Sequence, residues 1–232
     1  MLSKRQFWKY LTRLHRWIGM VLGVQILIWF LSGFFMSFFD IESVRGTHIA
    51  EKASFSLDLK SVKPLSDIGL KRVTNVALKG TAGGGAVYAV NGDNSTHYID
   101  AETGDKWAGM TEKNIRLAAS VYYTGDTMPI SVRQLFKTPI EYRGALPVWQ
   151  VTYGDGPKTR LYLDAQTGEL KAVRTWLWRV FDFMWMLHIM DYDDRDDINN
   201  WWLWLASFFA ALFALSGLAL VFHRTVLRPK AR

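Results

Sequence analysis

Two histidine–arginine pairs stand at the ends of the two longest uncharged stretches of the chain. His15 and Arg16 precede the first stretch, and His223 and Arg224 follow the second. If both stretches cross a membrane, the two histidines lie at the same depth on the same side. Imidazole is a common axial ligand of haem iron, and a neighbouring arginine could pair with a haem propionate. The pattern therefore predicts a haem held between two helices.

Small side chains extend from each histidine along one helical face. The residues that share these two faces are His15, Gly19 and Gly23 in the first stretch, and Ser216, Ala219 and His223 in the second. A flat macrocycle between helices needs such clearance. Other interpretations stay open, because Gly-x-x-x-Gly also favours helix packing. Arginines at a membrane edge are also ordinary cytoplasmic anchors, and a histidine there can be merely interfacial.

A third histidine, His188, precedes the second uncharged stretch in an aromatic-rich segment. It is a candidate ligand for a second haem. Its partner could be His48 or the His188 of a second subunit. The alternative is a histidine that hydrogen-bonds Asp191 or Asp193.

The uncharged stretches are long enough to span a bilayer. They cover residues 17–39 and 198–222. At ~1.5 Å per residue, a 23-residue helix is roughly 34 Å long, which exceeds a ~30 Å hydrocarbon core. We therefore predict two transmembrane helices.

The basic residues predict the orientation of these helices. Residues 1–16 and 223–232 together carry nine lysines and arginines and no acidic residue. Because basic flanks stay on the cytoplasmic side, both termini are expected in the cytoplasm of a bacterium. The segment 40–197 is then periplasmic, and the membrane is the inner membrane. An uncleaved anchor is favoured over a signal peptide, since the apolar region is long and no small-x-small cleavage site follows it.

The sequence lacks the motifs of several kinds of catalytic and binding site. The chain has no cysteine, so any haem is haem b, bound without a covalent link. The glycine-rich segment 80–86 has no Gly-Lys-Ser/Thr after it, and no hydrolase, zinc-protease, flavin or nicotinamide motif occurs. The basic ends reflect topology, so nucleic-acid binding is not indicated. The aspartate-rich segment 191–197 lacks EF-hand spacing, so it is interpreted as a solvated loop, with cation binding left open.

An internal repeat occupies the central segment. Residues 96–104 and 160–168 each combine a short strand with the run Asp-Ala-x-Thr-Gly. Alternating apolar residues and Gly/Asn/Asp turns predict a β-hairpin in each copy. The remaining expected elements are partner strands at 87–90 and 148–151, third strands at 106–107 and 170–172, and helices at 66–73 and 111–122. The pattern predicts a duplicated α+β unit.

The segment Trp176–Met190 is rich in tryptophan and leads into the acidic segment 191–197. About 15 residues cannot cross the bilayer and return. We predict an amphipathic helix lying in the membrane interface.

Several motifs of the sequence resemble those of a known family. Leu14–Gly23 is similar to the first helix of PepSY-associated transmembrane proteins, and Leu187-His188 and Ser216-Gly217 are similar to later positions. The Asp-Ala-x-Thr-Gly units resemble PepSY domains, in which a helix packs on a small antiparallel sheet. Larger members include inner-membrane reductases that release iron from ferric siderophores and hold haem b with transmembrane histidines.

This resemblance implies a haem-binding electron carrier or ferric siderophore reductase, with His15, His188 and His223 as ligands. The chain has fewer spanning helices than those reductases, so a homodimer or a partner membrane subunit is expected. A cytoplasmic dehydrogenase or a quinol would be the electron donor, and a periplasmic ferric chelate the acceptor. PepSY domains also act as inhibitory or binding modules, so a non-enzymatic accessory or assembly subunit is the alternative.

The expected fold is a membrane α+β protein, with two transmembrane helices flanking a periplasmic duplicated PepSY-like domain and one interfacial helix. The expected segments are a basic N-terminus at 1–16, helices at 17–39 and 198–222, PepSY-like repeats at about 60–109 and 110–173 within 40–173, an interfacial helix and loop at 174–197, and a basic tail at 223–232.

Overall fold

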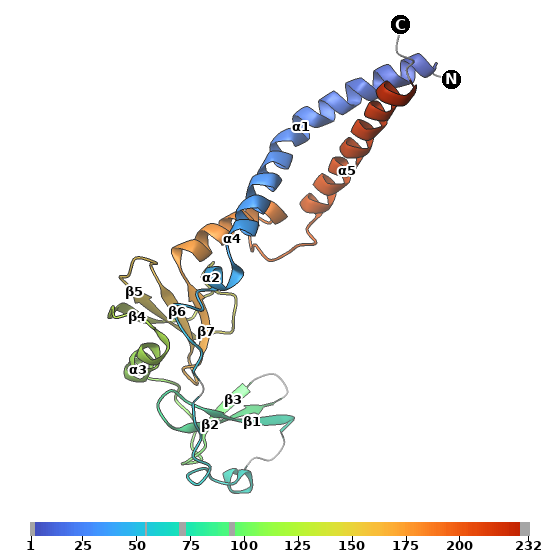
Figure 1. Cartoon of the computed structure of the whole chain (residues 1–232). Coiled ribbons are helices and arrows are strands. Elements are labelled where there is room, and N and C mark those ends of the chain that lie inside the picture. The colour runs from blue at the N-terminus through green and yellow to red at the C-terminus, as the bar shows by residue number, and fades with distance from the viewer. Residues whose placement is uncertain (1–2, 54, 70–72, 93–95, 228–232) are drawn as a thin grey trace. The chain divides into compact units, whose positions relative to one another are not determined.

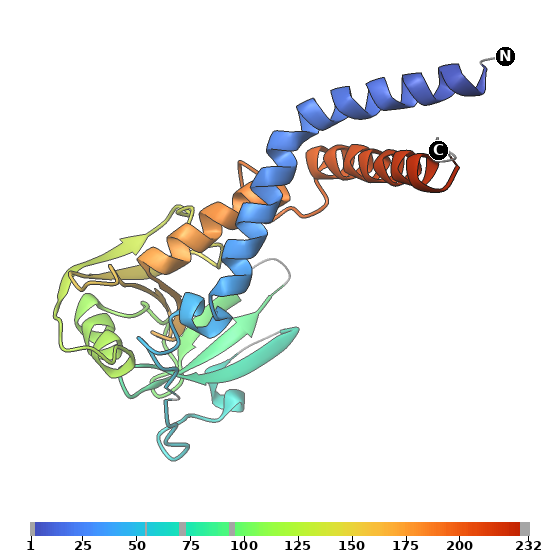
Figure 2. The same ribbon diagram turned by 45° about the horizontal axis from the view of Figure 1, so that its top comes forward.

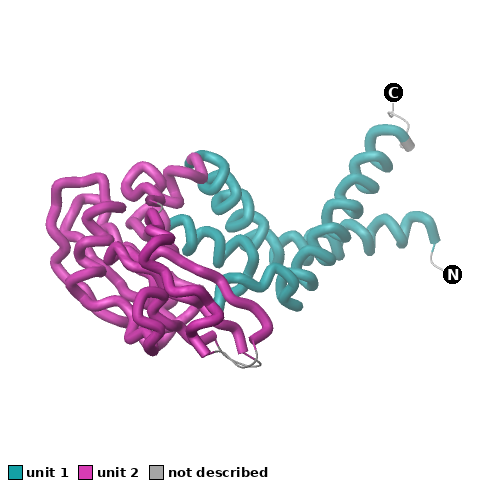
Figure 3. Tube along the Cα trace, turned by 90° about the horizontal axis from the view of Figure 1, so that it is seen from below, with its two compact units in different colours: residues 1–39, 180–232 teal, residues 40–179 magenta. Residues whose placement is uncertain are grey.

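The structure is a computed structural model that describes residues 3–53, 55–69, 73–92 and 96–227. The chain divides into two compact units, residues 1–39 with 180–232 and residues 40–179 (Figure 3). The first unit is helical and the second contains all the described strands. The predicted tail beyond residue 227 lies outside the described residues.

Two long antiparallel helices form most of the helical unit (Figures 1 and 2). Helix α1 covers Lys4–Phe38, and α5 covers Trp201–Phe222 and continues into a π-helical turn, His223–Leu227. The start of α1 lies well before the predicted start at residue 17. A capping box explains this: Ser3 Oγ accepts from the Gln6 N–H, and Gln6 Oε1 accepts from the Ser3 N–H. The basic N-terminus is therefore helical.

Both long helices are apolar enough and long enough to cross a membrane. Their apolar side chains are exposed on the isolated chain, as Phe30 at 73% and Leu218 at 67% illustrate. Water is a poor environment for so large an apolar surface, whereas hydrocarbon is a good one.

Helix α4, Trp176–Ile189, confirms the helix predicted at 176–190. In the acidic segment after it, the Asp191 carboxylate accepts the backbone N–H groups of Asp196 and Asp197 at 2.9 and 3.0 Å. These bonds, that from Asp197 first, hold the pKa of Asp191 below its usual value. Among the described residues, no three acidic or histidine side chains are grouped to hold a metal ion.

A four-stranded antiparallel sheet and helix α3 contain the larger core of the second unit. The strands are β4 (Pro129–Leu135), β5 (Val148–Tyr153), β6 (Arg160–Asp164) and β7 (Leu170–Arg174). Helix α3, Glu112–Tyr122, confirms the predicted helix at 111–122, and Thr111 caps it. Its buried residues recur at helical spacing and pack on β5 and β6.

A three-stranded antiparallel sheet forms the rest of this unit. Its strands are β1 (Asn75–Gly80), β2 (Ala86–Asn91) and β3 (Thr96–Asp100). A smaller cluster around Ala86, Tyr88 and Ala101 forms its core. Two short helices complete the unit, α2 (Ile41–Arg45) and a 3-10 helix (Leu65–Ile68).

The two predicted hairpins are confirmed and share one register. Val87 pairs with Asp100 in the first, and Val148 pairs with Asp164 in the second. Both aspartates accept the N–H groups two and three residues onward. The turn glycines, Gly104 and Gly168, have φ of 81° and 74°, a conformation that glycine adopts without strain.

Other local predictions were incomplete. The third strand at 170–172 is confirmed as β7, but the one at 106–107 is reduced to a single bridge between Ile99 and Lys106. In place of the helix at 66–73, the described residues form only the short 3-10 helix, because Gly69 at φ 70° ends it; residues 70–72 lie outside the description. The edge strands β1 and β4 were not predicted.

Candidate functional site

His15 lies on α1 and is held by α5. Its Nδ1 is 2.7 Å from the Oγ of Ser216. Its ring stacks on Phe213, with ring centres 4.3 Å apart and planes 4° apart. A Cβ atom at Gly217 would lie 3.1 Å from His15 Cε1, so glycine leaves the room that the ring occupies.

His188 lies on α4 and is held by α1 in the same manner. Its Nδ1 is 3.0 Å from the Oγ of Ser32. A Cβ atom at Gly33 would lie 3.4 Å from His188 Cε1. The indole N–H of Trp29 also donates to the His188 carbonyl oxygen at 2.8 Å. A Ser-Gly dipeptide on a long helix therefore seats each of these two histidines.

Each serine hydroxyl that contacts an imidazole also donates to a backbone carbonyl oxygen of its own helix. Ser216 Oγ–H donates to the carbonyl oxygen of Phe213 at 2.7 Å, and Ser32 Oγ–H donates to that of Ile28 at 2.7 Å. A hydroxyl has a single proton, so one that donates it to the carbonyl oxygen can only accept from the imidazole. This arrangement corresponds to the Nδ1–H tautomer of both rings. Within the described part of the chain, nothing hydrogen-bonds to either Nε2, which keeps its lone pair.

The two sites lie far apart along α1 but on one side of it. Gly33 follows His15 by 18 residues. At 3.6 residues per turn this is five turns, or roughly 27 Å along a straight helix. That length approaches the ~30 Å thickness of a hydrocarbon core. By this spacing, the two histidines are separated along α1 by roughly the thickness of a hydrocarbon core.

His223 does not face His15, so the prediction that the two lie at one depth is wrong. The ring of His223 stacks on Trp8, with ring centres 3.8 Å apart and planes 7° apart. His15 meets Ser216 instead. The two rings are thus offset by seven residues on each helix, or roughly 10 Å. They cannot bind one iron from opposite faces within one chain in this arrangement.

The helix register explains this offset. A Cβ atom at Gly19 would lie 2.8 Å from Phe213 Cε2, so only glycine lets the phenyl ring approach this closely. The Gly19 position thus serves helix packing, as the alternative interpretation held. In contrast, apart from the neighbouring residues and backbone of α1 itself, no described heavy atom lies within 4 Å of a Cβ built at Gly23.

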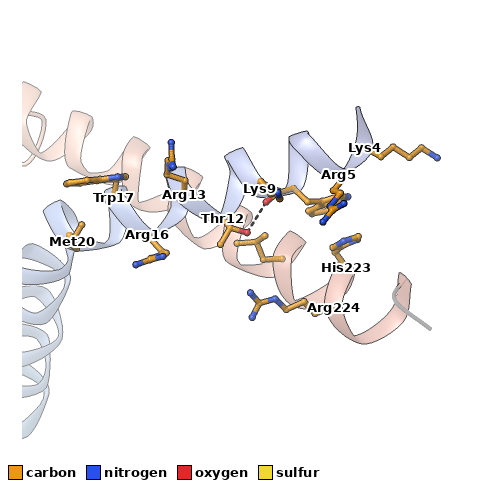
Figure 4. Close-up of a pocket in the computed structure, with 12 residues that line it drawn as sticks. Lys4, Arg5, Lys9, Thr12, Arg13, Arg16, Trp17, Met20, His223 and Arg224 are labelled. Atoms are coloured by element: carbon orange, nitrogen blue, oxygen red, sulfur yellow. Dashed lines mark hydrogen bonds between the residues drawn. The ribbon is translucent and has the colours of Figure 1, made fainter. Parts of the chain in front are cut away.

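Arg16, Arg224 and His223 line one cavity, of about 1210 Å³, at the basic end of the helical unit (Figure 4). His15 is not among the lining residues. The remaining lining residues are Lys4, Arg5, Trp8, Lys9, Thr12, Arg13, Trp17, Met20 and Leu220. The Nδ1 of His223 is buried and has no hydrogen-bond partner among the described residues.

His188 lines a smaller and mostly apolar cavity of about 430 Å³. Its other walls are Ile26, Trp29, Phe30, Ile189, Leu203 and Ser207. The proposed bond from His188 to Asp191 or Asp193 is wrong, because Nδ1 pairs with Ser32 and Asp191 accepts from its own loop. His48 lies in the unit of residues 40–179, where its carbonyl oxygen accepts from Thr124 at 3.2 Å.

A buried carboxylate in the sheet unit was not predicted. Glu141 is only 9% exposed and forms ion pairs with Arg160 and Arg179. It also accepts the Tyr162 hydroxyl at 3.1 Å. Burial would raise the pKa of Glu141, but the hydrogen bond from Arg160 and the charge of Arg179 outweigh it, so the pKa is lowered. This network ties the first turn of α4 to β6.

The serines that seat the histidines were also missed as partners. A signal was present, because Ser-Gly occurs in each of the two uncharged stretches, at 32–33 and 216–217. In each dipeptide the serine hydroxyl contacts an imidazole; Gly217 also leaves room for the His15 ring, whereas a Cβ atom at Gly33 would make ordinary contact with His188. Trp8 and Trp29 gave no comparable signal, since tryptophans are frequent throughout both ends of the chain.

Comparison with protein families identifies a matching family model. The family model described as PepSY-associated TM region matches residues 12–232. This confirms the family that the sequence motifs indicated. No curated protein and no solved structure matches the chain.

Proposed function

Because the chain belongs to the PepSY-associated transmembrane family and is a membrane α+β protein, we propose that it binds haem b and carries electrons across the membrane. The observation that supports this proposal most strongly is the pair of seated histidines. His15 and His188 lie near the two ends of the apolar unit, and each keeps an unpaired Nε2. The acceptor would be a ferric siderophore on the side of the sheet unit.

The chemistry of the two histidines fits an axial ligand. A neutral imidazole that ligates a metal normally donates its other N–H to a neighbouring group, which fixes the ring. Ser216 and Ser32 provide that acceptor here. Haem b, when bound, supplies reversible one-electron chemistry. The protein would hold the iron at Nε2 and would exclude water with apolar side chains such as Trp29 and Leu203.

A second copy of the chain would complete each site. Within the described residues, neither His15 nor His188 faces another histidine. A homodimer would supply a second imidazole for the haem at both levels, and it would bring four helices together. The open space beside Gly23 leaves a face of α1 on which a second helix could pack.

The basic ends of the chain support the proposed orientation. Both termini would be cytoplasmic, with the sheet unit in the periplasm of a bacterium. Electrons from a cytoplasmic dehydrogenase or quinol would then enter at the level of His15 and leave at the level of His188. Arg16 and Arg224 would stay available for anionic groups at the cytoplasmic side.

The first test is spectroscopic and uses the full-length protein. We expect protein purified in mild detergent from haem-replete cells to give a b-type reduced-minus-oxidised spectrum, with sharp α and β bands. Pyridine haemochrome analysis would give the stoichiometry, which we expect to be two haems per dimer, one at the level of His15 and one at the level of His188. A colourless protein that remains folded and dimeric would contradict the proposal and leave the non-enzymatic accessory subunit as the better explanation.

The tautomer assignment has its own test, which does not need haem. In protein freed of haem and labelled with ¹⁵N-histidine, we expect the nitrogen shifts of His15 and His188 to show protonated Nδ1 and unprotonated Nε2. Ser216→Ala and Ser32→Ala should each release one of these rings into a mixture of tautomers, because the acceptor is lost. Ser37→Ala, which removes a hydroxyl bonded only to the Phe34 carbonyl, is the control. Unchanged ¹⁵N shifts in both Ser216→Ala and Ser32→Ala would refute the tautomer assignment.

A further inference from the structure

The cavity at the basic end of the helical unit has an unusual charge. Six of its lining residues are lysine or arginine, and none is acidic: Lys4, Arg5, Lys9, Arg13, Arg16 and Arg224. No salt bridge within the described residues involves any of the six. Six like charges around one cavity repel one another, and a bound anion would relieve this repulsion.

The same cavity has an apolar part. Trp17, Met20 and Leu220 line it, and all three belong to the apolar segments of α1 and α5 (Figure 4). The charged residues of α1 end at Arg16, where the uncharged stretch begins. The cavity therefore changes from cationic to apolar along α1, at the level where lipid head groups meet hydrocarbon.

A rigid aromatic pair lies beside the cationic part. The Trp8 and His223 rings stack 7° from parallel and join α1 to the π-helical turn after α5. Both residues line the cavity. The stack joins the end of α1 to the turn after α5. The lysines and arginines of α1 and Arg224 therefore line the same cavity.

We propose that this cavity binds the head group of an acidic phospholipid that carries more than one phosphate, such as a diphosphatidylglycerol. The lysines and arginines would bind the phosphates, and acyl chains would lie along Trp17 and Met20. Two phosphates match six cations better than one does, and the volume of about 1210 Å³ accommodates a double head group. A soluble phosphate compound would leave the apolar part uncovered. This site is independent of the proposed haem ligands, since neither His15 nor His188 lines it.

The test is lipid binding to the full-length protein, delipidated in neutral detergent and observed by native mass spectrometry. The probes are tetraoleoyl diphosphatidylglycerol, dioleoyl phosphatidylglycerol and dioleoyl phosphatidylcholine at equal concentration. We expect retention in that order, with the first held at least tenfold more tightly than the last. Arg13→Gln/Arg16→Gln should weaken the first roughly tenfold.

The matched control is Lys52→Gln/Lys113→Gln, which removes the same charge from the sheet unit and should leave binding unchanged. Because the chain has no cysteine, Lys137→Cys labelling in intact cells, before purification, can verify that each variant keeps its orientation. Equal retention of all three lipids would overturn the proposal. So would equal loss in the control, or displacement of the lipid by millimolar inorganic phosphate. Loss of haem from the Arg13→Gln/Arg16→Gln protein would also overturn the proposal, because it would indicate that the cavity holds haem and not lipid.

Discussion

His15→Ala and His188→Ala should each remove about half of the haem absorbance, and the double variant should be colourless. Each substitution deletes one imidazole whose Nε2 is the proposed ligand, while the other level keeps its own. The loss should be large because an axial ligand has no substitute among the described neighbours of either ring. Reduced-minus-oxidised spectra on equal amounts of folded protein measure it.

The matched controls for this prediction are two other histidines. His97→Ala changes a residue of β3 and should keep the full haem content. His223→Ala should also keep it, because His223 stacks on Trp8 and lies about 10 Å from His15 along the helix pair. If His223→Ala loses haem while His15→Ala does not, the ligand assignment is wrong and the basic cavity is the haem site.

Glu141→Gln should destabilise the sheet unit by about 2–3 kcal/mol. The substitution leaves Arg160 and Arg179 without their carboxylate, and removing one partner of a buried ion pair costs ~3–5 kcal/mol. We expect the lower value because the Arg160 side chain is 38% exposed, so water screens part of the interaction. Pulse proteolysis in urea on full-length protein measures the change. Glu112→Gln, which breaks an exposed pair with Arg116, should change stability by less than ~0.5 kcal/mol.

The same carboxylate predicts a dependence on pH. The pKa of Glu141 lies below its ordinary value of 4.5 in the folded protein, so the folded state holds fewer protons than the unfolded state. The stability that Glu141 contributes is therefore complete above pH 4.5 and is lost as the pH falls below it. Glu141→Gln should lose that part of the acid sensitivity. An unchanged acid profile in the variant would show that other carboxylates account for it.

The sequence predicted best the features that depend on local chemistry. The two hairpins follow from alternating side chains and from an Asp-Ala-x-Thr-Gly turn whose aspartate caps its own backbone. Helix α3 follows from an apolar face and a threonine cap. The edge strands β1 and β4 were missed because their order depends on pairing with β2 and β5, which no local pattern specifies.

His15 and His188 were named as candidate ligands from the sequence, but the groups that hold them were not predicted. The symmetry of the two His-Arg pairs in the sequence contains no information on helix register. That register depends on the contact of Gly19 with Phe213, between residues far apart in the chain. The pairing of His15 with Ser216 follows from it. The partner of His188 could be found only once α4 was placed against Ser32.

The five-turn separation between His15 and Gly33 gives α1 a rotational phase that constrains changes in its length. Each residue turns the helix by 100°, so one inserted residue between the sites would rotate Ser32 away from α4 while His15 kept its place on α5. Removing seven residues changes the phase by only ~20° and shortens the helix by roughly 10 Å. In relatives adapted to bilayers of different thickness, the number of residues between these two sites should therefore differ by near-whole helical turns. This spacing can be used to recognise such relatives.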